Sequence, residues 1–556
     1  MDRADVLAGR ATTSQRRELV TDSIENAGGV AFQDPAAQAA AGDGSTAGGW
    51  LYPVMSVDLD GDGGDEVVLQ QYSESDHQYL IAVNKQGALW RYQVPTYSYM
   101  YGALEGDLFA GPGRELAVLV DDWEQQVTVL AAVGAHGLKW ELPLGRDYVE
   151  VNGLVEGDQD AQDEIAMTRW ATPRSPRVRT IDGETGLIRS ELRSTPEQLG
   201  LGSGYTQAFV TDGAVGGADL AVFVTPLMTG YTAEKRSLVD GSQVSFELFP
   251  VGQPHTLFQG PDFTGDSKRD ARIAEWTPGV EDSFTYGVFD AASMGTVWTT
   301  TVHPTQTSFI YSYRPGNVDG SKGEDFCIFE SDYTFDELET ASATVRCLAG
   351  ETGGELWKVS RAAIGFYAEI YENIFSDVDG DGLVDPIVEV FEYSCDDVDL
   401  INCDDRAETT AFSGSNGEPI WTLEGYESTG LWYDLTDANL DRRPGDDVLE
   451  PVYDPARPQG ARFRVKRGLD LRTESWRGLV DTGTREGSVG WPIDPDLNGD
   501  GSSEVVVTAN AMEGIGDPYH CEVWEGRQYC YYEEYRTYAY VAAFRADGRP
   551  LWRLEV

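Results

Sequence analysis

The stretch SVDLDGDGGDEVVLQ, from Ser56 to Gln70, places a loop of acidic and glycine residues between two apolar segments. Counted from Asp58, side-chain oxygens stand at loop positions 1, 3, 5 and 9, which are Asp58, Asp60, Asp62 and Glu66, and glycine stands at positions 4 and 6. Calcium binds six to eight oxygens at about 2.3–2.6 Å, and a tight loop supplies them from alternate residues. Glycine lets the backbone fold around the ion without a Cβ clash. The stretch therefore predicts a strand–loop–strand unit that binds Ca²⁺.

The same loop recurs along the chain. Two further copies are complete, SDVDGDGLVDPIVEV (Ser376 to Val390) and DPDLNGDGSSEVVVT (Asp494 to Thr508), with oxygens from Asp377, Asp379, Asp381 and Asp385, and from Asp496, Asn498, Asp500 and Glu504. Partial copies offer Glu156, Asp158, Asp160 and Glu164; Asp262, Thr264, Asp266 and Asp270; Asn317, Asp319, Ser321 and Asp325; and Asp437, Asn439 and Asp441, the last with a longer return to Asp446 or Asp447. Asp107–Glu115 and Thr211–Asp219 keep the frame but few of the oxygens. Loop starts near 58, 107, 156, 211, 262, 317, 377, 437 and 496 divide the chain after residue 48 into nine units.

A second motif follows each early loop by roughly thirty residues, a glycine turn that leads into an aromatic strand. Its copies are Gly87 with Trp90, Gly137 with Trp140, Gly295 with Trp298, Gly354 with Trp357, Gly417 with Trp421 and Gly548 with Trp552, while Gly186 keeps the turn without the tryptophan. Apolar alternation and turn residues mark four short strands in each unit. Four-stranded units that repeat in this way are the blades of a β-propeller. The sequence therefore predicts an all-β fold, a single large β-propeller of eight or nine blades, with the calcium loops between strands one and two.

The acidic loops resemble FG-GAP repeats of the integrin α type, whose pattern is D-x-D-x-D-G-x-x-D. The glycine–tryptophan turns are similar to those of pyrroloquinoline-quinone-like propellers, where the tryptophan packs between neighbouring blades. The resemblance covers about nine-tenths of the chain. Integrin-type rings have seven blades and quinoprotein-type rings eight, whereas nine units are present here. Either one ring holds eight or nine blades or a terminal unit lies outside it, and the complete first and last units favour nine.

The domain boundary and the charge follow from composition. Residues 1–48 end in an Ala/Gly-rich stretch and are expected to form a tail or linker, flexible or docked elsewhere, before a propeller of residues 49–556. The formal net charge of −53 argues against nucleic acid and anionic lipid as partners. The chain has no apolar run long enough to insert into a membrane, and no signal peptide is recognisable.

The six cysteines form three near neighbours: Cys327 with Cys347, Cys395 with Cys403, and Cys521 with Cys530. Each pair brackets the hairpin between the second and third strands of one unit, where two cysteines can face each other across the ladder. Disulfides are the expected pairing. Metal binding is the alternative, although no pair has C-x-x-C spacing. Disulfides imply an oxidising compartment, extracellular, at the cell surface or periplasmic.

The longest hairpin, from Met512 to Tyr538, is the expected partner-binding element. In four-stranded blades the loops from strand two to strand three lie on the face opposite the calcium loops. The aromatic residues expected to bind there are Tyr519, Trp524, Tyr529, Tyr531 and Tyr532. Tyrosine and tryptophan are favoured at protein contacts. The alternative is a well-folded, disulfide-stapled arm without a partner.

The function predicted from the sequence is a binding, adhesion or assembly module for a protein or a glycan, stabilised by Ca²⁺. The calcium loops are expected to be structural rather than signalling elements. A polysaccharide-active enzyme of the lyase type on the same fold is the alternative, and an assembly subunit docked through the tail is a third reading. Catalysis is the less favoured reading, because the five histidines are not clustered with Lys or Arg and no catalytic motif is present.

Overall fold

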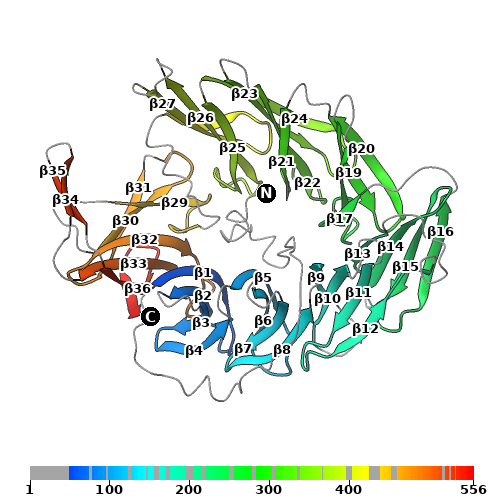
Figure 1. Cartoon of the computed structure of the whole chain (residues 1–556), viewed down its shortest axis with the longest axis horizontal. Coiled ribbons are helices and arrows are strands. Elements are labelled where there is room, and N and C mark those ends of the chain that lie inside the picture. Colours follow the sequence, from blue (N-terminus) through cyan, green and yellow to red (C-terminus); the bar gives the residue numbers. More distant parts are fainter. Residues whose placement is uncertain are drawn as a thin grey trace.

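Nine antiparallel sheets stand side by side in a closed ring in the computed structural model (Figure 1). The structure describes residues 49–556 except 74–77, 95–97, 123–126, 146–147, 156–161, 171–175, 196–205, 214–218, 250–255, 278–282, 303–306, 335–338, 366, 396–402, 425–438, 453–459, 472, 516–519, 525–526 and 532–533. The tail expected at 1–48 therefore lies outside the described residues. The prediction of an all-β propeller is confirmed, and the blade number is nine, with the first and last units both in the ring.

Each sheet is one blade, and the strands of a blade follow one another along the chain. Blades 1 to 4 are built from β1(Gly49–Val57), β2(Glu66–Ser73), β3(Gln78–Asn84) and β4(Gly87–Val94); β5(Ser98–Gly106), β6(Glu115–Asp122), β7(Val127–Gly134) and β8(Gly137–Gly145); β9(Tyr148–Val155), β10(Glu164–Trp170), β11(Pro176–Ile181) and β12(Ile188–Leu192); and β13(Gln207–Thr211), β14(Leu220–Pro226), β15(Tyr231–Ser237) and β16(Gln243–Phe249). Blades 5 to 7 are built from β17(Leu257–Gln259), β18(Ala271–Thr277), β19(Ser283–Asp290) and β20(Gly295–Val302); β21(Thr307–Gly316), β22(Asp325–Thr334), β23(Glu339–Leu348) and β24(Glu355–Gly365); and β25(Tyr367–Ser376), β26(Asp385–Cys395), β27(Cys403–Phe412) and β28(Pro419–Glu424). Blade 8 holds β29(Asp447–Pro451), β30(Ala461–Arg467) and β31(Glu474–Val480), and blade 9 holds β32(Glu486–Ile493), β33(Val505–Ile515), β36(Glu534–Phe544) and β37(Pro550–Glu555).

Two blades depart from the simple pattern. Blade 8 has three described strands, and its expected first strand falls among residues 425–438, outside the described part of the chain. In blade 9 the connection from β33 to β36 carries a further hairpin, β34(His520–Trp524) with β35(Arg527–Tyr531), that forms a sheet of its own. Figure 1 shows this hairpin projecting away from the ring.

The core lies between neighbouring blades. The middle strands are largely buried, and in β7 all eight residues are buried, because each blade is covered by one neighbour on either side. One cluster joins Val68 and Leu80 of blade 1 to Val118 and Ala131 of blade 2. Each blade thus buries its apolar faces only by stacking in the ring, as in other repeat folds.

In several blades the glycine–tryptophan motif joins the outer strand to the next blade. Trp357 of β24 donates its indole N–H to the carbonyl of Gly414 in blade 7 at 2.5 Å. The indole of Trp357 also packs on the turn at Gly417, where an added Cβ would lie 2.9 Å from it. Equivalent indole bonds run from Trp140 to Gly183, Trp298 to Gly350 and Trp421 to Gly468. The expected packing of tryptophan between blades is therefore present.

Turns and loops share one face of the ring. Asp325, at the end of the blade-6 acidic loop, accepts a hydrogen bond from Gly350 in the turn between the third and fourth strands of the same blade. The acidic loops and the glycine turns therefore lie together on one face, here called the loop face. The hairpins between second and third strands leave from the opposite face.

The ring closes without exchange of a strand between the first and last blades. Leu51 N donates to Asn510 Oδ1 at 3.2 Å, and Leu69 of blade 1 packs in one cluster with Val506 and Val541 of blade 9. Side-chain packing and loop contacts therefore hold this seam between blades 9 and 1.

One disulfide is described, Cys327–Cys347. Both residues are buried beside the blade-6 acidic loop, at the loop-face end of β22 and β23. The sequence predicted the pairing, but the bond ties the two strands in the core rather than in the projecting hairpin. Cys395 and Cys403, and Cys521 and Cys530, stand opposite each other in register. No described helix has the length and apolar character needed to span a membrane.

Candidate metal centre

The acidic loops are folded by their own carboxylates. In the blade-1 loop, Asp58 accepts backbone hydrogen bonds from Gly61 at 2.8 Å and from Gly63 at 3.0 Å. Both glycines have positive φ, +74° and +91°, a conformation that a side chain would strain. The blade-7 loop repeats these bonds around Asp377. The glycines predicted from the motif are thus required by the turn.

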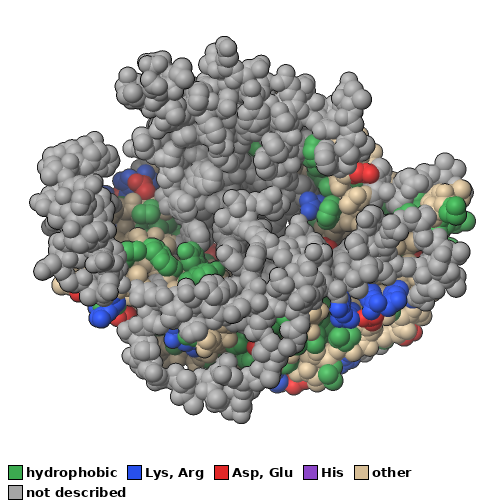
Figure 2. Space-filling model, in the orientation of Figure 1, with side chains coloured by type: hydrophobic (Ala, Val, Ile, Leu, Met, Phe, Trp, Pro, Cys, Tyr) green, Lys and Arg blue, Asp and Glu red, His purple; other side chains and the backbone are tan. Residues whose placement is uncertain are grey.

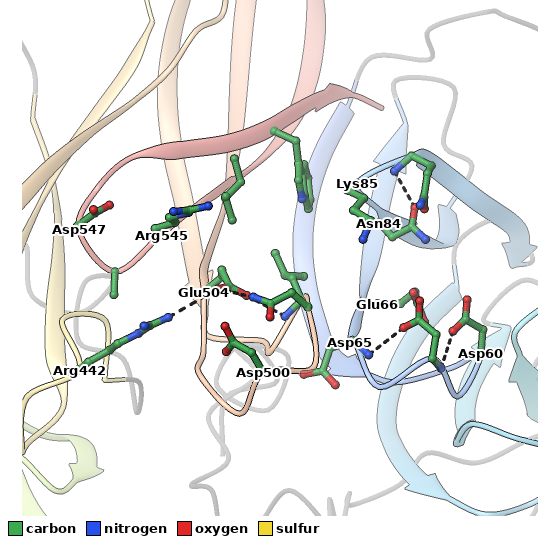
Figure 3. A pocket seen from close by; sticks show the side chains of 18 of the residues that line it. Asp60, Asp65, Glu66, Asn84, Lys85, Arg442, Asp500, Glu504, Arg545 and Asp547 are labelled. Carbon is green, nitrogen blue, oxygen red and sulfur yellow. Dashed lines mark hydrogen bonds and ion pairs between the residues drawn. The ribbon is translucent and has the colours of Figure 1, made fainter.

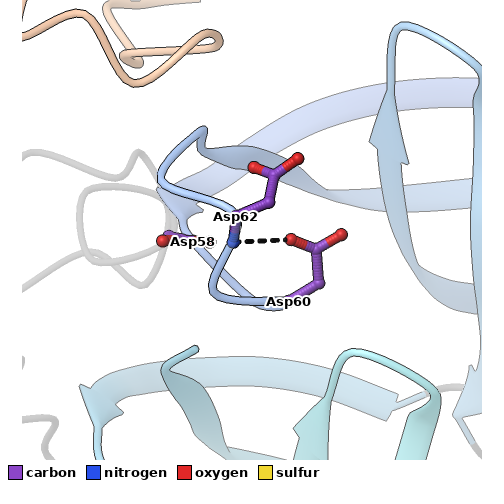
Figure 4. A group of neighbouring side chains, drawn as sticks. All are labelled: Asp58, Asp60 and Asp62. Carbon is purple, nitrogen blue, oxygen red and sulfur yellow. Dashed lines mark hydrogen bonds between the residues drawn. The ribbon is translucent and has the colours of Figure 1, made fainter. Parts of the chain in front are cut away.

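The next two acids of the blade-1 loop, Asp60 and Asp62, also accept backbone hydrogen bonds within the loop. Asp60 accepts from Asp62 N at 3.1 Å, and Asp62 accepts from Gly64 N at 2.9 Å. Asp58, Asp60 and Asp62 each present one oxygen within 4.8 Å of the other two (Figure 4). Asp377, Asp379 and Asp385 form a second such group in blade 7. Two of the three complete loops therefore bring together three of their four predicted ligand positions, which are 1, 3 and 5 in blade 1 and 1, 3 and 9 in blade 7.

The donor set of these two groups fits a hard cation. All three donors are carboxylates, without thiol or imidazole, which favours calcium or magnesium over zinc. Each carboxylate uses loop N–H groups for orientation and retains acceptor capacity, since an ionised carboxylate has about four lone-pair sites. Three like charges held this close repel one another unless a cation neutralises them. Asp58, Asp60 and Asp62 would hold such an ion in blade 1.

The ninth loop position has a structural role that the sequence does not reveal. Asp385 is buried and accepts from Val378 and Asp379 with one oxygen and from Gly414, in the turn ahead of β28, with the other. The same contacts recur at Asp270 and Asp325. This acid therefore ties the loop to the neighbouring turn within one blade.

Burial raises the pKa of these ninth-position acids. The pKa of Glu66 rises to about 7, because the carboxyl is desolvated and lies beside Asp60. Desolvation likewise raises the pKa values of Asp270, Asp385 and Asp447 to about 7, and that of Asp325 to about 6. The ionised form of these carboxyls is therefore destabilised in the loops, and a bound cation or a proton would lower that free-energy cost.

In the other described loops, neutral side chains at ligand positions bond to the loop itself. Asn317 Nδ2 donates to Ser321 O at 2.6 Å, and Asn498 Nδ2 donates to Glu504 Oε1 at 2.9 Å. Thr264 donates its hydroxyl to Asp270. The residues Glu156, Asp158, Asp160 and Asp437 lie outside the described residues. Cation binding at these loops stays a prediction.

In the blade-4 loop, which has few acidic ligands, an arginine side chain from the neighbouring blade supplies a positive charge. Arg269, from the blade-5 loop, reaches Asp212 at 3.1 Å and Asp219 at 3.4 Å in the blade-4 loop. Its side chain is buried and also donates to Leu154 O. An arginine just before the ninth-position acid is the only sequence signal for this contact.

A ladder of backbone bonds links successive loops. The amide at position 8 of one loop donates to the carbonyl at position 1 of the preceding loop, as Arg114 does to Asp58 at 2.8 Å. The seam is joined in the same way, Asp65 N to Asp496 O at 2.7 Å, and Asp65 Oδ2 accepts from Asp496 N in return. Among the described residues, such bonds join six successive pairs of loops into a band on the loop face.

A cleft of about 930 Å³ opens where this band crosses the seam (Figure 3). It is lined by the loops of blades 1 and 9, by the glycine turns of the same blades and by two residues of blade 8. Its charged residues are Asp60, Asp62, Asp65, Glu66, Asp441, Asp500, Glu504 and Asp547, with Lys85, Arg442 and Arg545. The cleft is therefore predominantly acidic, and the sequence did not reveal it.

The predicted partner-binding residues fall on the extra hairpin of blade 9. Trp524 ends β34, and Tyr529 and Tyr531 lie in β35, with Trp524 opposite Arg527 in register. Tyr519 and Tyr532 lie outside the described residues. The topology places this hairpin on a connection from the face opposite the loops, as expected.

No family model and no curated protein matches this chain. Among solved structures, it is similar to an exotype rhamnogalacturonan lyase, YesX (16% identity, 78% of each chain covered, TM-score 0.40). It is also similar to rhamnogalacturonan lyase YesW (14% identity, 81% of this chain and 87% of that one, TM-score 0.39). A rhamnogalacturonan lyase of Bacillus licheniformis matches with 13% identity over 88% of this chain and 89% of that one, TM-score 0.39. At this identity and TM-score the likeness says nothing about the activity of this chain.

Proposed function

We propose that this protein is a calcium-stabilised β-propeller of the FG-GAP type that serves as a binding or assembly module for a protein or a glycan. The observation that carries the proposal is the carboxylate group Asp58, Asp60 and Asp62, which the loop holds with one oxygen of each within 4.8 Å. A second group of the same kind in blade 7 supports it.

The expected stabilisation is large enough to matter. A site with Kd of about 0.1 mM in about 1 mM calcium contributes roughly 1.4 kcal/mol, and two such sites roughly 3 kcal/mol. A domain's net stability is about 5–15 kcal/mol. Calcium in the loops would therefore rigidify the band that links the blades, as a structural ion does.

The rest of the molecule suits display outside the cytosol. The disulfide Cys327–Cys347 favours an oxidising compartment. Millimolar calcium outside cells would fill weak loops. The hairpin β34–β35 projects from a closed ring, and rigid scaffolds with projecting loops are where binding concentrates (Figure 1).

Melting with and without calcium tests the calcium role. Excess EDTA is expected to lower the melting temperature by several degrees, and calcium in excess of the chelator is expected to restore it. Unchanged melting in EDTA would exclude structural calcium.

A second experiment separates binding from catalysis. The calcium-loaded protein is applied to a glycan array, and acidic polysaccharides are incubated with it and assayed for unsaturated uronate products. Binding without product supports a binding module. Product that accumulates with time would establish the lyase alternative instead.

A further inference from the structure

The cleft at the seam contains acids that accept hydrogen bonds from the chain and two bases that form no ion pair with a described residue. Each of its eight carboxylates accepts at least one hydrogen bond from the chain itself. Asp500, for example, accepts from Ser502 N at 2.9 Å, and Glu504 accepts from Leu497 N at 3.1 Å. The acids of the floor are thus used to fold the loops.

Two bases of the cleft are not used in this way. Lys85, in the blade-1 turn, and Arg545, in the blade-9 turn, form no ion pair with any residue of the described chain, and both are exposed. Arg442, by contrast, lies 3.7 Å from Glu504. In Figure 3, Lys85 and Arg545 lie across the cleft from Asp500, Asp65 and Glu66.

Exposed bases without an ion pair also occur elsewhere among the described residues, as at Lys358 of β24, but Lys85 and Arg545 line one and the same cleft. The chain has 94 acidic residues and 41 Lys and Arg, so most basic side chains can find an acidic neighbour. Blue and red side chains lie next to one another at several points on the surface shown in Figure 2. Two unpaired bases at the rim of one cleft therefore mark a place where an anionic group can be received.

The wall beside them is apolar. Trp552 and Leu551 line the cleft, and Leu551 is 39% exposed although its strand packs against blade 1. The amides of Asn84, Gln86 and Asn498 complete the lining. An apolar wall beside amide groups and bases matches a sugar acid, which has apolar C–H faces, hydroxyls around its edge and a carboxylate.

We infer that this cleft binds a carboxylated oligosaccharide, with Lys85 and Arg545 on its carboxylates and Trp552 against a sugar ring. The inference rests on the proposed function, because the acidic floor repels an anion unless cations fill the adjoining loops. Asp60, Asp62 and Glu66 belong both to the blade-1 loop and to the cleft floor. Calcium in that loop therefore raises the affinity for the saccharide, and the saccharide raises the affinity for calcium by the same factor.

Calorimetry with tetragalacturonate tests this site. The full chain is titrated in calcium and again in EDTA, and neutral tetragalactose serves as the uncharged probe. Lys85→Gln and Arg545→Gln are each expected to weaken binding roughly tenfold, the cost of one hydrogen bond between charged groups. The matched controls are Lys358→Gln, an exposed lysine of β24, and Arg467→Gln, at the end of β30, both outside the cleft.

The expected result is binding of tetragalacturonate in calcium, at least tenfold weaker binding in EDTA, and unchanged affinity in both controls. Absence of binding by a protein that calcium does stabilise overturns this inference and leaves the proposed function standing. Equal binding of the neutral sugar, of a poly-glutamate peptide or of spermine overturns the assignment to a carboxylated saccharide. Absence of any calcium effect on melting overturns the proposed function itself.

Discussion

At the scale of single residues, the acidic loops use their carboxylates twice. Position 1 and position 9 fold the loop by accepting backbone N–H groups, as Asp58 and Glu66 do in blade 1. Burial, together with the charges of Asp60 and Asp62, raises the pKa of Glu66 to about 7. Folding of these loops therefore brings negative charges together, and a bound cation would offset their repulsion.

Asp62→Asn separates these two roles. The amide oxygen can still accept from Gly64 N, but one negative charge leaves the group. The apoprotein is expected to melt slightly higher and the blade-1 site to lose roughly tenfold in calcium affinity, since charge count sets affinity in such sites. Calorimetric calcium titration and melting in EDTA measure both effects, with the exposed Glu418→Gln as control. A lower melting temperature in EDTA would contradict the repulsion on which this prediction depends.

Arg269 supplies a fixed positive charge where the blade-4 loop lacks acidic ligands. Arg269→Met is expected to destabilise the fold by roughly 2–3 kcal/mol, because Asp219, whose side chain is 13% exposed, loses this ion pair, and the partial exposure of Asp212 limits the loss. Denaturant unfolding in EDTA and in calcium should give the same loss. The neighbouring Lys268→Gln, whose ion pair with Asp266 is more exposed, should change stability little. A loss that disappears in calcium would show that this loop binds the ion.

At the scale of elements, the fourth strand of one blade and the turn of the next form a repeated joint. The sequence motif found five of these tryptophans, Trp90, Trp140, Trp298, Trp357 and Trp421. It missed Trp476 of β31, which packs on Gly548 and donates to Leu440 O at 3.4 Å. It was hidden because Leu471, not glycine, takes the positive φ of 51° in that turn. The only sequence signal for this joint was a tryptophan five residues after a turn that has no glycine at its positive-φ position.

The indole hydrogen bond of this joint can be tested at Trp357. Trp357→Phe keeps most of the apolar contact but leaves the buried carbonyl of Gly414 without its donor. The expected destabilisation is about 1–3 kcal/mol, the cost of one unsatisfied buried group. Urea unfolding measures it, and Leu356→Ala on the exposed side of the same strand should cost clearly less. Equal losses would place the joint's energy in general packing rather than in the hydrogen bond.

At the scale of the whole molecule, the ring is closed by side chains and loops only. Asp65 and Asp496 are 431 residues apart in sequence and exchange two hydrogen bonds across the seam. Burial and the charge of Asp496 raise the pKa of Asp65. The seam thus concentrates carboxylates in the same way as each loop, and the stability of the ring is expected to depend on pH and on cations.

The pH dependence has a definite sign. The ninth-position acids have pKa values near 7 in the folded protein and near 4 when unfolded, so between these values the folded state binds more protons. The free energy of unfolding in EDTA therefore falls as the pH rises from about 4 to about 7, and melting should be lower at pH 8 than at pH 5. Calcium at pH 8 should remove much of this difference. A melting temperature that rises with pH in EDTA would show that paired acids such as Glu450, whose pKa is lowered, dominate instead.

The acidic loop could be predicted from the sequence alone, because it depends on contacts within a few residues of one another, and the blade could be predicted from the repetition of that loop. The bonds from Asp58 to Gly61 and Gly63 span at most five positions, so a nine-residue motif contains the whole turn. Three features appear only in the folded molecule: nine blades close one ring, Arg269 enters a neighbouring loop, and Lys85 and Arg545 face one cleft without an acidic partner among the described residues. These features join residues tens to hundreds of positions apart, and their geometry depends on the stacking of blades, which no local pattern encodes.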